Sequence, residues 1–283
     1  MSNFPILDVI DNRFYFGIGG MGDFLLLMST FYDKEMKKLR DSPTGYVGPD
    51  VVFVCNNIHV IKEMAKEFPL IDRLWFYPRK SFLADQLMWE NIITDEHCWG
   101  TGVTPKDFNY IKDWIECGKS DVFEYYGVKE HPEFAKPIKP RHFIVIQPFG
   151  GADDTTKKKE IPQQDIHKIT EQAYEDGLRV IFIGSEKDKD NLPLNKLALE
   201  SGQAHWVTDI RRAMPAIRGC CAFYGADSWG KTLACMAGKK TAVYKSKYSF
   251  PPEEQFGHYK DPGNHVFLDG WDIIMEEPHV ERY

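Results

Sequence analysis

The sequence has few features of a membrane, secreted or metal-binding protein. No apolar run approaches the roughly 18 residues that a membrane-spanning helix requires, so no membrane span is expected. The N-terminus lacks a basic segment followed by an apolar one, which a secretion signal would have. None of the 6 cysteines forms a C-x-x-C pair, which argues against the usual zinc and redox motifs. These absences predict a cytoplasmic protein with reduced, buried thiols.

Positive charge is also scarce, above all in the first half of the chain. The formal net charge is -7, and residues 1–136 carry 15 Lys and Arg against 21 Asp and Glu. Proteins that bind nucleic acid normally present a basic face. An acidic front half therefore disfavours a polyanionic partner.

The first half alternates short apolar runs with amphipathic stretches. Residues 13–18, 51–55 and 73–78 are strand-like, and residues 22–40 and 58–69 have helical periodicity. Strands that alternate with helices are typical of a parallel sheet with crossover helices. The front half therefore predicts an α/β domain.

A second α/β domain is predicted after a proline-rich segment. Residues 129–142 contain three prolines and no apolar periodicity, which is typical of a linker. The alternation then resumes, with strands expected at 142–148, 179–184, 205–207, 222–227 and 240–245 and helices near 162–176, 188–201, 211–220 and 229–238. We therefore expect two Rossmann-like domains, residues 1–136 and 137–283, that face a central cleft. Ligands in such sheets bind beyond the carboxyl ends of the strands.

A glycine-rich turn, "GIGGMGD" (17–23), lies between the first strand and the first helix. Gly17, Gly19 and Gly22 match the dinucleotide pattern G-x-G-x-x-G in its usual context. That pattern also requires an acid at the end of the second strand, where this chain reads "VCNN", and Asp23 would repel a pyrophosphate at the helix N-terminus. Binding of NAD is therefore disfavoured. The alternative is a loop of Gly19, Gly20 and Gly22 with Asp23 as a helix cap.

The segment "QPFGGADDTTKKKEIP" (147–162) leaves the first strand of the second domain. It presents Thr155, Thr156 and three lysines before a helix. Hydroxyl, ammonium and backbone N–H groups together suit a phosphate. A solvated charged loop is the alternative, but the position at a strand end favours binding.

The segment "GADSWGKTLACMAGKKTAVY" (225–244) joins a strand to a helix. Asp227 ends the strand, Ser228 follows, and Gly230 opens a helix that carries Lys231 and Thr232. A Ser/Gly helix N-terminus at the carboxyl end of a strand is typical of an anion site. An ordinary turn capped by Asp227 or Ser228 is the alternative.

Two weaker signals remain. Asp188 and Asp190 form a D-x-D pair that would suit a divalent metal, although this spacing is common in charged loops. Trp206, Trp229 and Trp271 would stack on a base or sugar, or fill the core. We expect surface charge at the acids and no metal site.

The order of these motifs resembles the two-domain B-type glycosyltransferases, and specifically the heptosyltransferase-like family. That family starts its first helix with a Gly-Asp pair, as Gly22 and Asp23 do here. Its second domain begins with a strand, a loop of Thr and Lys and a proline-started helix. Lys159 stands three residues before Pro162, like the phosphate lysine of that family.

Two later motifs extend the resemblance over most of the chain. "FIGSEKD" resembles a strand–Gly–x–x–Glu element, and "DSWGKTLACMAG" resembles D-[ST]-G-x-x-H-L-A-A-x-x-G. The chain departs from the second pattern because Trp229 replaces the glycine, which follows at Gly230, and Thr232 replaces the histidine.

The resemblance implies an inverting, metal-independent glycosyltransferase with a nucleoside-diphosphate sugar as co-substrate and no cofactor. Asp23 would act as the general base on the acceptor hydroxyl. Glu186 would bind the ribose, and backbone near residues 207–209 would meet the base. The residues expected at the donor are Thr155, Thr156, Lys159, Glu186, Asp227, Ser228, Gly230, Lys231 and Thr232.

The resemblance leaves the acceptor open. A glycan is the first expectation. Some phage enzymes that glycosylate modified DNA bases share this architecture, so hydroxymethylated DNA is the alternative acceptor. An NAD-dependent oxidoreductase and a non-catalytic nucleotide-sugar-binding protein are the alternatives of another class. Local basic groups that would serve DNA are Lys34, Lys37, Lys38 and Arg40, and Arg79 and Lys80.

Overall fold

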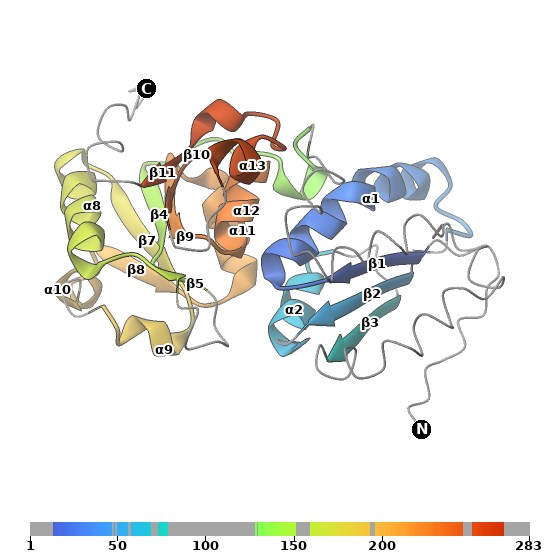
Figure 1. Cartoon of the computed structure of the whole chain (residues 1–283), viewed down its shortest axis with the longest axis horizontal. Coiled ribbons are helices and arrows are strands. Elements are labelled where there is room, and N and C mark those ends of the chain that lie inside the picture. The colour runs from blue at the N-terminus through green and yellow to red at the C-terminus, as the bar shows by residue number, and fades with distance from the viewer. Residues whose placement is uncertain are drawn as a thin grey trace. The chain divides into compact units, whose positions relative to one another are not determined.

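The computed structural model divides the chain into two compact units, Met1–Tyr125 and Tyr126–Tyr283 (Figure 1). The residues that the structure describes are 14–46, 48, 50–55, 58–68, 73–78, 128, 130–150, 159–192, 196–245 and 251–268.

The first unit contains a parallel three-stranded sheet with the order β1-β2-β3. The strands and helices expected in this half are confirmed, with α2 ending a few residues earlier than predicted. Their bounds are β1 Phe14–Ile18, α1 Met21–Asp41, β2 Asp50–Cys55, α2 Ile58–Ala65 and β3 Arg73–Pro78.

Aromatic side chains form the core of the first unit. Phe24 on α1 packs edge-on against Phe53 on β2, with ring centroids 5.2 Å apart, and against Phe68 after α2, at 5.9 Å. All three side chains are buried. Their burial fixes α1 on the sheet and places its N-terminus at the carboxyl end of β1.

The second unit contains a six-stranded sheet whose neighbouring strands all run parallel. The order is β11-β10-β9-β4-β7-β8. The chain thus runs outward from β4 to β8, returns beside β4 at β9, and runs outward again. This is the order of doubly wound nucleotide-binding sheets. The bounds are β4 Phe143–Gln147, β7 Arg179–Ile183, β8 Ala204–Val207, β9 Ala222–Ala226, β10 Lys240–Tyr244 and β11 His265–Leu268.

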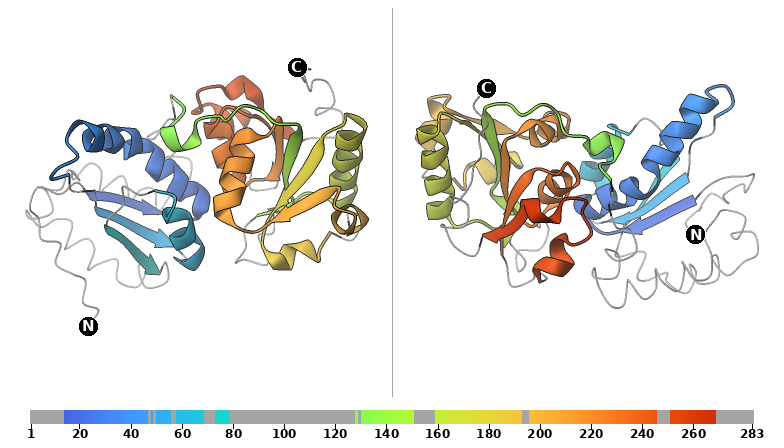
Figure 2. Two further views of the ribbon diagram at one scale, coloured as in Figure 1. Left: turned by 180° about the vertical axis from the view of Figure 1, so that it is seen from behind. Right: turned by 90° about the horizontal axis from the view of Figure 1, so that it is seen from above.

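Helices cover both faces of this sheet. Helix α8 (Gln163–Glu175) lies on one face, and α11 (Ile210–Gly219) and α12 (Trp229–Met236) lie on the other (Figures 1 and 2). Ile166 and Ile169 of α8 are buried in one cluster with Ile144 and Phe182 of the sheet. None of the helices among the described residues is long and apolar enough to cross a membrane.

The helix predicted at 188–201 is wrong as a single element. The structure has two short helices, α9 (Glu186–Lys189) and α10 (Lys196–Glu200), on either side of Pro193. Proline inside a helix lacks an N–H and clashes with the preceding turn. Six further elements were not expected: the strands β5 (Phe149–Gly150), β6 (Lys159–Glu160) and β11, the helix α13 (Pro252–Phe256), and the 3-10 turns η1 (Glu133–Ala135) and η3 (Pro262–Asn264).

The proline-rich segment is bonded to the second unit. It contains the 3-10 turn η1 (Glu133–Ala135), whose Phe134 is buried. The N–H groups of Ile138 and Arg141 donate to the carbonyls of Arg218 and Gly219, at 2.9 and 3.0 Å. This stretch therefore follows α11 closely instead of forming a loose connection.

The described cysteines agree with the expectation of buried thiols. Cys55, Cys220 and Cys235 are buried and Cys221 is half-buried, and all four are free. Burial raises the pKa of the Cys55 thiol to about 11 and that of Cys220 to about 12. These thiols are therefore protonated and unreactive at neutral pH.

Candidate functional site

The sheet of the second unit changes direction between β4 and β9. Doubly wound sheets bind ligands at such a switch point, beyond the carboxyl ends of the strands. Here β4 ends at Gln147, and Asp227 and Ser228 follow directly after β9. The chain thus brings three polar residues to the place where this architecture holds its ligands.

The carboxylate of Asp227 binds two lysines. Lys159 Nζ lies 2.8 Å from Oδ2 and Lys231 Nζ lies 3.0 Å from Oδ1. The side-chain amide of Gln255 also donates to Oδ1, at 3.3 Å. The Lys231 side chain is 3% exposed and that of Lys159 is 21% exposed, so only Lys159 retains substantial contact with solvent.

Burial and the neighbouring charges shift the pKa values of Asp227 and Lys231 in opposite directions. Burial disfavours the ionised carboxylate of Asp227, but Lys231 and Lys159 outweigh it and hold the pKa of Asp227 far below its usual range. Burial also disfavours the Lys231 ammonium, but Asp227 raises the pKa of Lys231 above its ordinary value. Asp227 and Lys231 are therefore both charged at neutral pH, and the formal charges of two lysines and one acid leave the cluster with one net positive charge.

The N-terminus of α12 is held by the side chain of Gln147. Its Oε1 accepts from the Gly230 N–H at 3.1 Å, and its Nε2 donates to Ser228 Oγ at 3.2 Å. A Cβ at position 230 would overlap Gln147 Oε1, so a larger residue there would displace the Gln147 side chain. The glycine of the third sequence motif thus permits close approach of β4 to the start of α12.

A small hairpin brings Lys159 to this site. Strand β5 pairs antiparallel with β6, so that Gly150 lies opposite Lys159. A Cβ at Gly150 would come within 3.0 Å of Ser228 Cβ. The two described ends of the predicted phosphate loop, Gly150 and Lys159, therefore lie beside the third motif, and Thr155 and Thr156 fall outside the described residues.

The structure revises the expected roles of two donor residues. The side chains of Lys231 and Thr232 are buried in α12, and direct contact between them and a ligand is not supported. Lys231 instead balances Asp227. Glu186 is exposed as the first residue of α9, and the ribose role expected of it stays a prediction.

The glycine turn of the first unit is closed by Asp23. Gly20 is the N-cap of α1, and the Asp23 Oδ2, three residues on, accepts from the Gly20 N–H at 2.7 Å. Gly19 has a φ of 140°, and a Cβ there would overlap the same carboxylate. Gly22 lies inside the first turn of the helix. A carboxylate thus occupies the amide that a dinucleotide pyrophosphate would use, which further disfavours NAD.

Other predicted features have local roles. Asp188 accepts from Ser185 N and Oγ, both at 2.8 Å, and so caps α9. No group of His, Cys, Asp and Glu in the described part of the chain is arranged to hold a metal. Trp206 stacks on Phe182, with ring centroids 6.0 Å apart. Trp229 is half-buried as the first residue of α12, and Trp271 lies outside the described residues.

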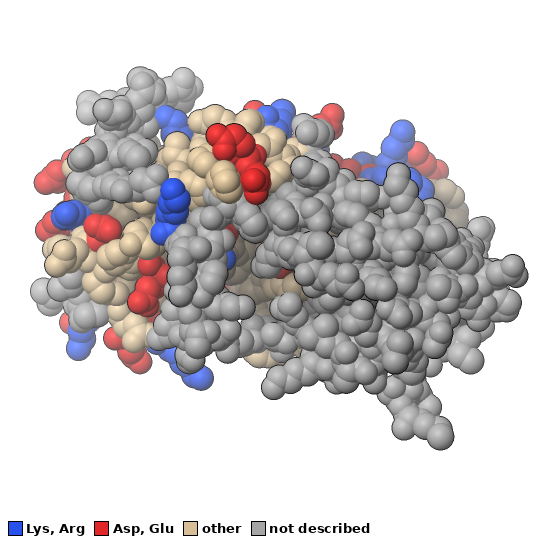
Figure 3. Space-filling view, in the orientation of Figure 1, with Lys and Arg blue, Asp and Glu red and all other residues tan. Residues whose placement is uncertain are grey.

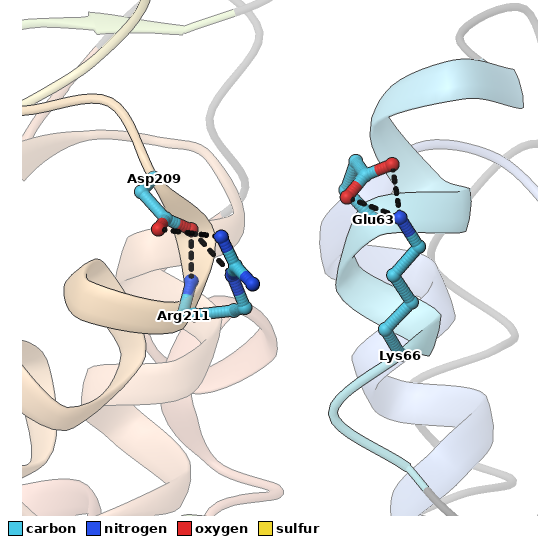
Figure 4. A network of polar contacts seen from close by, with 4 residues as sticks. All are labelled: Glu63, Lys66, Asp209 and Arg211. Carbon is cyan, nitrogen blue, oxygen red and sulfur yellow. Dashed lines mark hydrogen bonds and ion pairs between the residues drawn. The ribbon is translucent and has the colours of Figure 1, made fainter.

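The segment expected near the base, 207–209, ends in a second capped helix. Asp209 accepts from the Arg211 backbone at 3.0 Å and from its guanidinium at 3.1 Å (Figure 4). The hydrogen bonds from Arg211 lower the pKa of Asp209. The figure also shows Lys66, which contacts both oxygens of Glu63 at the end of α2, at 2.6 and 2.7 Å. Both pairs are exposed, and exposed ion pairs of this kind contribute little to the free energy of unfolding.

Two residues of the site, Gln147 and Gln255, were not predicted from the sequence. Gln147 carries a detectable signal, because a polar residue ends an otherwise apolar strand just before the second motif. Gln255 carries none, because it lies in a short helix 28 residues after the carboxylate that it binds. Its role depends on a tertiary contact.

No family model matches the sequence, and no curated protein does. Among solved structures, the fold is similar to E. coli heptosyltransferase WaaC with ADP, with a TM-score of 0.50 and 8% identity over 90% of this chain and 92% of that one. The same enzyme with ADP-2-deoxy-2-fluoro heptose gives 0.51 and 7% over the same shares. E. coli ADP-heptose LPS heptosyltransferase II gives 0.50 and 12% over 92% of each chain. The chain therefore shares the fold of the heptosyltransferases that its motifs resemble.

Proposed function

We propose that this protein is a glycosyltransferase that moves a sugar from a nucleoside-diphosphate sugar to an acceptor hydroxyl. The observation that carries the proposal is the placement of Lys159 beside the start of α12, at the switch point between β4 and β9. The fold is shared with enzymes whose structures contain ADP and an ADP-sugar. A cation and a helix N-terminus are the groups that a departing diphosphate needs.

The second unit would hold the donor. Lys159 is the cation within reach of solvent, and it would leave or share Asp227 to contact the diphosphate. Lys231 would keep Asp227 charge-balanced during that exchange, because its buried ammonium stays 3.0 Å from the carboxylate. Ser228 would add a hydroxyl. Thr155, Thr156 and Glu186 remain proposed contacts to the phosphates and the ribose.

Asp23 would be the general base in an inverting reaction. Its carboxylate would take the proton of the acceptor oxygen as that oxygen attacks the sugar carbon and the bond to the diphosphate breaks. The transition state would have oxocarbenium character, as in glycoside hydrolysis. The hydrogen bond from Gly20 at 2.7 Å would fix the carboxylate in place. We propose a metal-independent reaction, because Lys159 and the helix supply the positive charge for the leaving group.

A ligand panel followed by turnover tests the proposal. We expect ADP, or another nucleoside diphosphate, to raise the melting temperature, since a ligand of the folded state stabilises it. The matching nucleotide sugar should then release its diphosphate when an acceptor is added. Failure of every nucleoside diphosphate to bind would refute the proposal, and binding without turnover would favour a non-catalytic sugar-nucleotide binder.

A pair of lysine variants locates the donor. Lys159→Met should weaken binding of the diphosphate roughly ten- to one hundred-fold, the usual effect of losing a hydrogen bond to a charged group. The control is Lys240→Met. Lys240 is the exposed first residue of β10 and so lies at the amino-terminal end of the parallel strands, opposite to the end where the donor would bind. Equal affinity in both variants would remove Lys159 from the site.

We propose a glycan as the acceptor, with hydroxymethylated DNA as the alternative. Lys38, one of the basic residues on α1, is paired with the buried carboxylate of Glu35 at 3.0 Å. The described charges of both signs are interspersed on the face seen in Figure 3. Binding of DNA would weaken steeply with salt, because phosphate neutralisation releases counterions. Turnover on a glycan should change little between low and physiological salt, and a steep loss on hydroxymethylated DNA would favour the alternative.

A further inference from the structure

Gln147 is a buried amide whose two ends both reach the start of α12. It is 4% exposed, and its partners Ser228 and Gly230 lie 81 and 83 residues further along the chain. A buried amide must be hydrogen-bonded to offset its loss of water. An apolar residue would fill the end of β4 without that requirement, so the amide calls for an explanation.

The chemistry of its partners fixes the orientation of this amide. The Gly230 N–H can only donate, so the amide oxygen must face it. The amide nitrogen must then face Ser228, whose Oγ accepts from it at 3.2 Å. A hydroxyl that accepts in one direction directs its hydrogen elsewhere. Ser228 makes no side-chain bond to the amides of its own helix.

We propose that Gln147 is a positioning residue that sets the Ser228 hydroxyl as a hydrogen-bond donor toward a diphosphate. The inference rests on the proposed donor site at the start of α12. A hydroxyl free to rotate serves an acceptor or a donor equally, whereas one that accepts from Gln147 presents its hydrogen to the ligand. Beside Lys159, such a donor selects a ligand rich in anionic oxygens.

Gln147→Glu is the decisive variant. Its carboxylate has nearly the same shape and still accepts from the Gly230 N–H, but it accepts from Ser228 instead of donating to it. It also adds negative charge where the diphosphate would lie. We expect the affinity for ADP, the probe in this experiment, to fall roughly ten- to one hundred-fold. The control is Gln203→Glu, which should leave the affinity unchanged. Gln203 is exposed and comes just before β8, so it lies at the amino-terminal end of the parallel strands, away from the start of α12.

A double-mutant cycle separates positioning from simple structural support. Ser228→Ala removes no side-chain hydrogen bond to the amides of α12, because Ser228 makes none, and it should lower ADP affinity by a similar factor. If Gln147 acts through Ser228, adding Gln147→Glu to Ser228→Ala should cost less than it does in the wild type, and the loss that remains is the repulsion between the added carboxylate and the diphosphate. Fully additive losses would overturn the inference, because they would give the two residues independent roles.

The outcomes distinguish this inference from the proposed function. If no nucleoside diphosphate binds the wild type, both are refuted. If ADP binds the wild type, and binds Gln147→Glu or Ser228→Ala equally tightly, the positioning role is refuted and the donor site stands. Should Gln147→Glu fail to fold, Ser228→Ala alone still decides, because unchanged affinity there removes the hydroxyl that Gln147 is said to orient.

Discussion

Lys231 and Lys159 both contact Asp227, but only one of them is fully buried, so loss of their charges should have different consequences. Lys231 Nζ lies 3.0 Å from the carboxylate with a side chain 3% exposed, and Lys159 Nζ lies 2.8 Å away with a side chain 21% exposed. Methionine replaces either lysine by an uncharged side chain of similar length. The variants Lys231→Met and Lys159→Met therefore compare a buried ion pair with a half-buried one on the same acid.

The burial of each lysine sets the expected loss in the free energy of unfolding. Removal of one partner from a buried ion pair costs roughly 3–5 kcal/mol, because the remaining charge is left uncompensated. Lys159 still compensates Asp227 in part, so we expect about 3 kcal/mol for Lys231→Met. A pair in contact with solvent contributes about 1 kcal/mol or less, which is the loss expected for Lys159→Met. Folded domains are stable by only roughly 5–15 kcal/mol, so the two losses are easily told apart.

Hydrogen exchange measures these losses where they occur. A chain with two compact units need not unfold in one step, so a single melting temperature would mix the two. Peptides from β9, α12 and β10 should lose protection in Lys231→Met and keep it in Lys159→Met. Asp227→Asn combined with Lys231→Met should recover part of the loss, because no buried charge is then left unpaired. Unchanged protection in Lys231→Met, or equal loss in both single variants, would refute the reasoning.

Three further predictions concern other parts of the molecule. Asp23→Asn keeps an oxygen that can accept from Gly20, so the fold and ADP affinity should persist while turnover falls by roughly 10²–10⁴-fold; near-wild-type turnover would leave Asp23 only its capping role. Burial lowers the pKa of His265 to about 4 from about 6.5 in the unfolded chain, so the unfolded state binds the proton first and stability should fall by up to about 3 kcal/mol as pH drops from 6.5 to 4. Urea unfolding at several pH values should show a smaller drop for His265→Phe, and an identical slope would contradict this. Turnover should survive excess chelator, and activity that is abolished by chelation and restored by Mg²⁺ would show that a metal takes part.

The sequence predicts most strands of this protein well because they are continuous runs of apolar residues. Residues 51–55 and 179–183 consist almost wholly of apolar side chains, which only a sheet covered on both faces can bury. The edge strand β11 was missed because it has four residues and an exposed Val266 at its centre. A short half-exposed strand has no periodicity that distinguishes it from a loop.

The candidate site was predictable in its location but not in its pairings. Glycine and hydroxyl residues after a strand mark a helix N-terminus, and so Ser228 and Gly230 could be found from the sequence alone. The burial of Lys231 could not, because it depends on Asp227 four residues earlier and on Gln255 packed from another helix. A lysine on a helix is normally solvated, and only the tertiary structure shows the acid that compensates it.

The departure at Trp229 and Gly230 changes how an anion would be held at this helix. The heptosyltransferase-like pattern has its glycine one residue earlier, and in this chain the Gly230 amide is already bonded to Gln147 at 3.1 Å. A phosphate bound at α12 would therefore find one fewer open N–H than at a helix N-terminus whose amides have no partner. Under the proposed function, more of its binding free energy would then have to come from Lys159 and from the hydroxyl of Ser228. For this reason, unchanged ADP affinity in Lys159→Met would be harder to reconcile with this protein than with one whose helix amides are all open.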